Sequence, residues 1–325
     1  MDTILTAAPP AAVSAPVSAA DPIRRLEDNI AQVVRGKSEV IRLATVCLLA
    51  RGHMLVQDVP GVGKTTLAHA LARSLGLGFQ RIQFTSDLLP SDIVGVSIFN
   101  QKTQAFEFVA GPLFAHVVLA DEINRATPKT QSALLEAMSE RKVSVDRKRY
   151  ALPAPFLVLA TQNPLEYHGT FPLPESQLDR FLMSLSLGYP PRADERELLL
   201  SGGVEDLLEQ LPAVLDRTEL LDLQARVQRI RVSERLADYL LALAEATRQD
   251  GEFLLGVSTR GLQGLFTAIQ ALALCEGRAF ALPDDVQRLA APVLAHRVIL
   301  KRGSSDLEAT RRAIERVVAA TPVPV

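Results

Sequence analysis

A glycine-rich segment, residues 58–65, ends in Gly-Lys-Thr and lies between an apolar run at 53–56 and a helical pattern at 66–73. Glycines let the backbone curl so that its N–H groups and the positive end of the following helix face a phosphate. From this position Lys64 can reach the β- and γ-phosphates, and Thr65 can supply an oxygen to Mg²⁺. The spacing predicts a phosphate-binding loop for a nucleoside triphosphate.

The loop departs from the strict pattern at its first position, where Asp58 stands in place of glycine. Taken alone, the segment leaves an alternative open, namely a strand-to-helix turn with an incidental Gly-Lys-Thr. The residues expected to line the phosphates are Pro60, Gly61, Val62, Gly63, Lys64, Thr65 and Thr66.

Two acidic residues end another apolar run, in which Asp121 and Glu122 follow Val117–Ala120. Hydrolysis of a nucleoside triphosphate needs Mg²⁺ beside the phosphates and a water oriented for in-line attack. We therefore expect Asp121 to hold the metal together with Thr65, and Glu122 to orient and polarise the water. A core strand that ends in two solvated carboxylates is the alternative, and the presence of the loop argues against it.

Three more polar residues lie next to apolar runs or at the start of a helix. Asn163 comes after the run at 156–160, where its amide can hydrogen-bond the γ-phosphate or the attacking water, although Asn-Pro also makes ordinary turns. Arg180 precedes the last apolar run and is a candidate arginine finger acting across a subunit boundary; a salt-bridged surface arginine is the alternative. Arg260 opens a helix beside a capping Ser258 or Thr259, from which it could fold back over the nucleotide.

These residues lie in longer strings that resemble the MoxR family of AAA+ ATPases, over about residues 21–318. The strings are Val59 to Thr65, Gly111 to Phe114, Leu119 to Ala126, Thr161 to Pro164 and Gln177 to Phe181. In this family an acidic residue is common at the position of Asp58, so the departure from the strict pattern favours the assignment.

The resemblance implies roles for the same residues, with ATP and Mg²⁺ as cofactors. Lys64 and Thr65 would contact phosphate and metal, and Asp121 and Glu122 would form the acidic pair. Asn163 would be the first sensor, Arg180 the finger and Arg260 the second sensor. Val34 and Gly36 would lie near the adenine.

The chain alternates helical patterns with short apolar runs up to about residue 188, which is typical of an α/β domain with a parallel sheet. Five strands are expected, at 54–57, 79–84, 116–120, 156–160 and 181–187. Beyond 190 the pattern is helical, so we expect an AAA+ core followed by an all-α lid. The expected domains are a disordered Ala/Pro-rich tail at 1–20, the nucleotide-binding core at 21–189, the lid at 190–318 and a flexible tail at 319–325.

Two stretches of alternating residues predict β-hairpins inserted in the core. One pairs 96–99 with 105–109, and the other spans 142–152. In ring-shaped relatives such hairpins face the central channel. The second hairpin carries a basic cluster that either contacts a partner or is a solvated turn; its members are Arg141, Lys142, Arg147, Lys148 and Arg149.

Composition limits the partners. The 325 residues carry a net charge of −2, which gives no general attraction to nucleic acid or to an anionic membrane. No apolar run approaches the roughly 20 residues that span a bilayer. The two cysteines, Cys47 and Cys275, have no metal-ligand spacing and suit a reducing cytoplasm.

The sequence thus favours an ATPase that forms a homo-oligomeric ring, expected to be a hexamer, and remodels or matures protein clients. The resemblance adds chaperone-like assembly of enzyme complexes, including metal-cofactor insertion, alongside proteins with von Willebrand factor A domains. Alternatives with the same core are a nucleic-acid motor and the ATPase subunit of a metal chelatase. A scaffold that binds ATP without hydrolysing it is disfavoured by Glu122.

Overall fold

The computed structural model describes residues 20–163, 169–200, 204–301 and 307–323. The tail expected at 1–20 lies outside this part except for Ala20, as do the last two residues of the expected C-terminal tail. Within the described residues a five-stranded parallel sheet forms the centre, with strand order β2-β5-β8-β1-β9. Its strands are β1 (Met54–Gln57), β2 (Phe79–Gln83), β5 (Val117–Asp121), β8 (Leu157–Gln162) and β9 (Met183–Leu185). The five expected strands are confirmed, each ending within a few residues of its predicted bounds.

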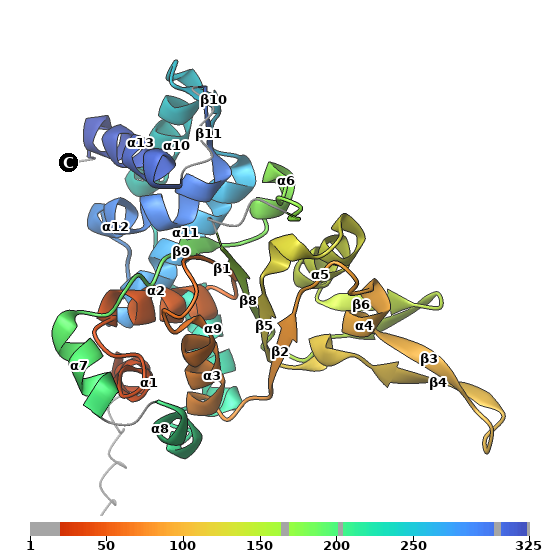
Figure 1. Ribbon diagram of the computed structural model, residues 1–325. Helices are drawn as coiled ribbons and strands as arrows, with labels where there is room; N and C mark the ends of the chain where they lie inside the picture. The colour runs from red at the N-terminus through yellow and green to blue at the C-terminus, as the bar shows by residue number, and fades with distance from the viewer. Residues whose placement is uncertain (1–19, 164–168, 201–203, 302–306, 324–325) are drawn as a thin grey trace, which may run out of the picture.

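Strands β5, β8, β1 and β9 are buried on both faces, as their apolar runs require, whereas the edge strand β2 is largely exposed. Successive residues point to opposite faces, so Val117 and Leu119 belong to one hydrophobic cluster and Val118 and Ala120 to the other. Three helices cover the first face, α1 (Ala20–Ala31), α2 (Ser38–Leu49) and α3 (Lys64–Ser74). The second face is covered by α4 (Pro90–Val94) and α5 (Pro128–Glu140), and Figure 1 shows the two groups on either side of the sheet.

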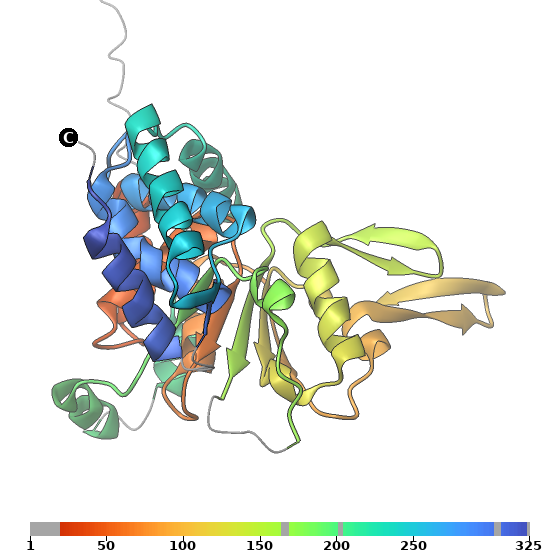
Figure 2. The ribbon, with the colours of Figure 1, turned by 90° about the horizontal axis from the view of Figure 1, so that it is seen from above.

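Both expected hairpins are confirmed. β3 (Gly95–Asn100) pairs with β4 (Ala105–Ala110), and β6 (Lys142–Val145) pairs with β7 (Lys148–Ala151). They extend from the same side of the molecule (Figures 1 and 2). The rings of Phe108 and Tyr150 stack with centroids 4.0 Å apart, so the two hairpins contact each other.

The C-terminal region is helical, as expected. Its helices are α7 (Arg192–Leu200), α8 (Glu205–Gln210), α9 (Arg217–Val227), α10 (Glu234–Gln249), α11 (Thr259–Cys275), α12 (Pro283–Leu294) and α13 (Leu307–Ala320). It also holds one antiparallel pair, β10 (Phe253–Leu255) with β11 (Ile299–Leu300), which the sequence did not predict. Strands of three and two residues are too short to give an alternating pattern.

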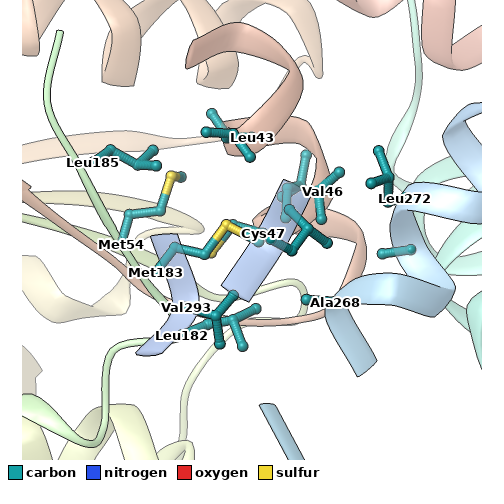
Figure 3. Packing of buried hydrophobic residues seen from close by; sticks show 14 of the residues in the cluster. Leu43, Val46, Cys47, Met54, Leu182, Met183, Leu185, Ala268, Leu272 and Val293 are labelled. Atoms are coloured by element: carbon teal, nitrogen blue, oxygen red, sulfur yellow. The ribbon is translucent and has the colours of Figure 1, made fainter. Parts of the chain in front are cut away.

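The lid helices share a hydrophobic core with the sheet. Figure 3 shows Cys47 of α2 beside Met183 of β9, and Val293 of α12 and Ala268 of α11 belong to the same cluster. In the part of the chain that the structure describes, single turns of 3-10 helix connect the larger elements, namely η1 (Pro112–Phe114), η2 (Ile123–Arg125) and η3 (Ala295–Arg297). A short helix, α6 (Glu175–Leu178), precedes β9. Helix α12 and the turn η3 pack on β9, which is an edge strand of the sheet. The lid therefore contacts the sheet at the strand that follows α6.

Candidate active site

The glycine-rich loop joins the end of β1 to the start of α3. Gly61 and Gly63 adopt φ angles of +82° and +94°, in the left-handed region that favours glycine. A Cβ atom built on either residue would meet no other atom within 4 Å, so the backbone angle, and not crowding, requires glycine here. Helix α3 begins directly after Gly63 with no side chain capping its first turn. Its N-terminal N–H groups therefore suit a phosphate.

Asp58 explains the departure from the strict loop pattern. This buried residue accepts hydrogen bonds from the backbone N–H groups of Leu187 and Gly188, at 2.6 and 2.7 Å, and from the Ser186 hydroxyl at 3.0 Å. Its other oxygen accepts from the N–H of Val59 at 2.9 Å. The carboxylate thereby fastens the phosphate loop to the chain leaving β9. The sequence marked the residue as unusual but did not reveal this role.

Lys64 lies at the loop, where its Nζ donates to the backbone oxygen of Asp58 at 2.9 Å. This contact folds the ammonium group over the turn that precedes α3. The next residue, Thr65, is in the first turn of the helix. Both residues are thus at the carboxyl end of β1.

Asp121 ends β5 and is held by two side chains. Its Oδ1 accepts from the Thr161 hydroxyl at 2.6 Å, and its Oδ2 accepts from Arg81 Nη2, also at 2.6 Å. The Thr161 hydroxyl also accepts from the backbone N–H of Glu122 at 2.8 Å. Thr161 therefore orients both acidic residues, a function that the sequence did not indicate because a threonine within an apolar strand is common.

Glu122 adopts φ +56° and ψ 51°, an uncommon conformation for a residue with a side chain. Such strain persists where surrounding contacts enforce it, and it gathers at functional sites. The carboxylate accepts from Gln83 Nε2 and from Arg125 Nη1, both at 2.9 Å. Gln83 ends β2, and Arg125 belongs to η2. Neither was among the candidate residues, although Arg125 lies in the string from Leu119 to Ala126 that carries the family resemblance.

Asn163 is buried directly after β8. Since β8 lies between β5 and β1, its carboxyl end separates the acidic pair from the phosphate loop, as expected. Beside it, Gln162 accepts a hydrogen bond from Gln57 Nε2 at 3.1 Å, and Gln57 accepts one from Ser184 at 3.0 Å. These amides join the ends of β8, β1 and β9.

The two candidate arginines, Arg180 and Arg260, lie together at a cavity that is separate from the phosphate loop. Arg180 and Arg260 border one cavity of about 240 Å³, which Asp179 and Arg297 also line. Arg180 Nη1 donates to the backbone oxygen of Leu135 at 3.0 Å and to the Ser139 hydroxyl, both on α5. No residue of the phosphate loop lines this cavity. From the start of α11, Arg260 was expected to be able to fold back over the nucleotide; in the structure it borders the same cavity as Arg180.

The segment expected near the adenine packs against the residues after β9. Val34 is buried, and Gly36 has φ +67°. A Cβ on Gly36 would come within 2.3 Å of Asp194 Oδ2, so both the angle and the space require glycine. Lys37 Nζ donates to the backbone oxygen of Tyr189 at 2.6 Å. Like the phosphate loop, this segment therefore contacts the connection between β9 and the lid.

Buried histidines are structural. His53 accepts from the N–H of Val158 at 3.0 Å on Nδ1, and its Nε2 lies 3.2 Å from the Met138 oxygen. Burial lowers the pKa of His53 to about 4. The ring is therefore neutral and donates from Nε2. It joins the end of α5 to β8.

Comparison with known proteins identifies two family matches. Residues 53–183 match the model of the ATPase family associated with various cellular activities (AAA), and residues 245–317 match that of the AAA lid domain. The first match spans the phosphate loop, the acidic pair, Asn163 and Arg180. Among the helices that the structure describes, none combines the length and the hydrophobicity of a membrane span.

Individual relatives match along nearly their whole length. YeaC of Bacillus subtilis, an uncharacterised protein, is 47% identical over 92% of this chain and 93% of its own length. Chaperone MoxR1 of Mycobacterium tuberculosis is 38% identical over 98% of this chain and 86% of its own. The crystal structure of a candidate ATPase from Cytophaga hutchinsonii has a TM-score of 0.84 at 36% identity, covering 94% of this chain and 96% of that one.

Proposed function

The chain belongs to the MoxR family of AAA+ ATPases, and from this premise we propose that it couples the binding and hydrolysis of Mg-ATP to the remodelling or maturation of protein partners. The observation that carries the proposal is the order of the sheet, in which β1, β8 and β5 are neighbours. The phosphate loop, Asn163 and the acidic pair follow these three strands, so they share one edge.

The donor set fits a magnesium nucleotide. The uncapped first turn of α3 and the ammonium group of Lys64 suit phosphate oxygens, and the residues from Pro60 to Thr66 surround them. The hydroxyl of Thr65 and the carboxylate of Asp121 offer the oxygen ligands that Mg²⁺ prefers. When bound, Mg²⁺ neutralises charge on the β- and γ-phosphates. Arg81 and Thr161 keep the Asp121 carboxylate oriented.

Glu122 is the proposed general base that orients the attacking water, and Asn163 hydrogen-bonds the γ-phosphate or that water. The Glu122 carboxylate is engaged by Gln83 and Arg125 through the same oxygen. Its second oxygen, Oε1, is therefore the one suited to the water.

Arg180 and Arg260 are proposed to act on the nucleotide of a neighbouring subunit. Their shared cavity is lined by no phosphate-loop residue, which supports a role between subunits for both arginines. A guanidinium supplied in trans stabilises the charge of phosphoryl transfer. The active form would then be a ring, with six subunits as the working hypothesis, and Val34 and Gly36 would border the adenine on the subunit that binds it.

The hairpins are the proposed contact with clients. Phe99 and Phe106 are 49% and 72% exposed, with ring centroids 5.3 Å apart, and an exposed aromatic pair of this kind favours a protein partner. The exposed Arg147 and Lys148 lie on the adjoining hairpin, so clients with acidic and apolar segments suit this surface. The name of MoxR1 supports a chaperone role. Proteins with von Willebrand factor A domains, and enzymes that receive a metal cofactor, are the client classes proposed, in the cytoplasm.

Three single variants test the site. Lys64→Ala should abolish nucleotide binding, Glu122→Gln should bind ATP without turnover, and Arg180→Ala should retain binding while losing hydrolysis by about 10³-fold or more. The measurements are binding of a fluorescent ATP analogue and steady-state phosphate release. Arg226→Ala, which removes an exposed ion pair on α9, is the matched control and should change neither. Normal hydrolysis by Arg180→Ala would refute the shared site.

A further inference from the structure

Arg297 is a buried arginine of the lid, only 5% exposed, that no sequence motif contains. It lies in η3 and contacts the backbone on both sides of Arg180. Its Nη2 donates to the oxygen of Phe181 at 2.6 Å, and its Nη1 donates to that of Leu182 at 3.3 Å. Its Nε forms an ion pair with Asp179 Oδ1 at 2.9 Å. One guanidinium thereby holds the residues before and after the candidate finger.

Asp179 connects this arrangement to the second arginine. The Ser258 hydroxyl lies 3.2 Å from each oxygen of the Asp179 carboxylate. The same hydroxyl accepts the N–H of Gly261 at 2.9 Å and so caps α11, whose second residue is Arg260. The segment 179–182 and the start of α11 are therefore fixed to one another as well as to η3.

The neighbouring His296 reinforces the junction. Its Nε2 lies 3.0 Å from the oxygen of Phe181, and burial lowers the pKa of its ring to about 3. The ring is neutral at ordinary pH, so Nε2 carries the proton and donates to this oxygen. Burial also lowers the pKa of Arg297, to about 10, which leaves the guanidinium charged near neutral pH.

The presence of a buried cation here needs a reason other than stability. Replacing a buried ion pair by apolar side chains of similar size is often neutral or stabilising, because removal of both charges from water is costly. Arg297 pairs with the Asp179 carboxylate and donates to backbone oxygens of segment 179–182, while its Nη1 also donates to the oxygen of Val293 on α12 at 2.7 Å. These directed contacts join the segment to the lid and fix its position in a way that apolar packing does not. The segment so fixed is the one that carries Arg180.

We propose that Arg297 is a positioning residue for the arginine pair: it fastens segment 179–182 to the lid so that Arg180 and Arg260 reach a neighbouring subunit's nucleotide with a fixed separation. This inference rests on the proposed role of Arg180 in trans. The lid then holds Arg180 in place, so a change in the position of the lid changes where Arg180 and Arg260 meet the nucleotide of the neighbouring subunit.

Arg297→Met should lower turnover by about 10²-fold, the loss that a small misplacement of a catalytic group produces, with ATP binding unchanged within about twofold. Arg297→Lys keeps the charge near Asp179 without the planar fork and should retain intermediate activity. The matched control is Arg278→Met, which removes another lid guanidinium, paired with the buried Asp285 at 2.6 Å. It should lose stability but retain turnover.

Mixed oligomers separate positioning from damage to the variant's own site. Arg297→Met subunits mixed with Glu122→Gln subunits should regain hydrolysis, because the former have an intact site and the latter an intact finger. Mixed with Arg180→Ala subunits they should stay inactive, because both lack a working finger. The reverse pattern, rescue by Arg180→Ala and not by Glu122→Gln, would overturn the inference and assign Arg297 to its own chain's site.

Two controls keep the outcomes distinct. The Arg180→Ala and Glu122→Gln mixture must itself regain activity; if it does not, the trans site of the proposed function fails rather than the role of Arg297. If Arg297→Met does not fold by circular dichroism, Asp179→Asn replaces it, because that carboxylate is 19% exposed and the change leaves its shape intact. Asp179→Asn must show the same pattern of rescue, and full activity of this variant alone would also contradict the inference.

Discussion

Replacing Asp58 with asparagine should destabilise the protein by about 3 kcal/mol and weaken ATP binding. The buried carboxylate accepts three backbone N–H groups, from Val59, Leu187 and Gly188. Asparagine has nearly the same shape but only one acceptor oxygen. The substitution therefore removes hydrogen bonds without creating a cavity.

The magnitude follows from which donors lose their acceptor. If the amide oxygen faces Leu187 and Gly188, the amide NH₂ faces the N–H of Val59, and one buried donor is left unsatisfied at a cost of about 1 to 3 kcal/mol. The two N–H bonds that remain, like the bond from the Ser186 hydroxyl to the same oxygen, change from a charged to a neutral acceptor, which costs about 1 kcal/mol more in total. The opposite orientation leaves two donors unsatisfied and costs more.

The assay is urea unfolding followed by circular dichroism, since the chain has no tryptophan, together with titration of a fluorescent ATP analogue. If the loosened loop holds its binding conformation in about one molecule in ten, the apparent affinity for ATP falls about tenfold. Ser186→Ala is the matched control: it removes one hydroxyl donor to the same carboxylate, leaves all three N–H bonds, and should cost below about 1 kcal/mol. A free energy of unfolding for Asp58→Asn within about 0.5 kcal/mol of the wild type would refute the role of this carboxylate.

Three further outcomes are expected. Thr161→Val keeps the shape of the buried side chain but removes the hydroxyl that bonds Asp121 and the N–H of Glu122. Turnover, measured as phosphate release, should fall about 10²-fold, while the ATP analogue still binds. Unchanged turnover would contradict the orienting role of Thr161. Gly63→Ala forces a side chain into φ +94° and should cost about 1 to 2 kcal/mol in urea unfolding while weakening ATP binding. The free energy of unfolding should fall between pH 7 and pH 5, because the buried His53 and His296 have pKa values near 4 and 3 while histidines of the unfolded chain take up protons near pH 6.5. The loss is about 2 kcal/mol per histidine. In urea unfolding at both pH values, His53→Gln should remove about half of this loss.

The sequence predicted those parts of the fold that rest on local patterns. Apolar runs such as Val117–Ala120 belong to strands buried on both faces, and the alternation at 96–99 and 105–109 belongs to a hairpin. The phosphate loop and the acidic pair were predictable for the same reason, since each follows a recognisable strand. Their convergence at one edge then follows from a parallel sheet.

Contacts between distant residues were not predictable. Arg297 and Phe181 are 116 residues apart, and nothing near Arg297 in the sequence distinguishes it from an exposed arginine. Thr161 looked like any β-branched residue of a strand, and its hydroxyl matters only because β8 lies beside β5. The grouping of Arg260 with Arg180 depends in the same way on how the lid packs on β9, which local patterns do not encode.

The central claim, that each ATP site is shared between two subunits, is tested most directly by phosphate release from mixtures of Arg180→Ala and Glu122→Gln subunits. Each parent alone should be nearly inactive. For randomly mixed rings with independent sites, a site works when its own subunit keeps Glu122 and its neighbour keeps Arg180, so an equal mixture should recover about a quarter of wild-type turnover. Activity should fall toward zero as either parent dominates. Mixtures that remain inactive at every ratio, or Arg180→Ala subunits that hydrolyse ATP alone, would contradict the account.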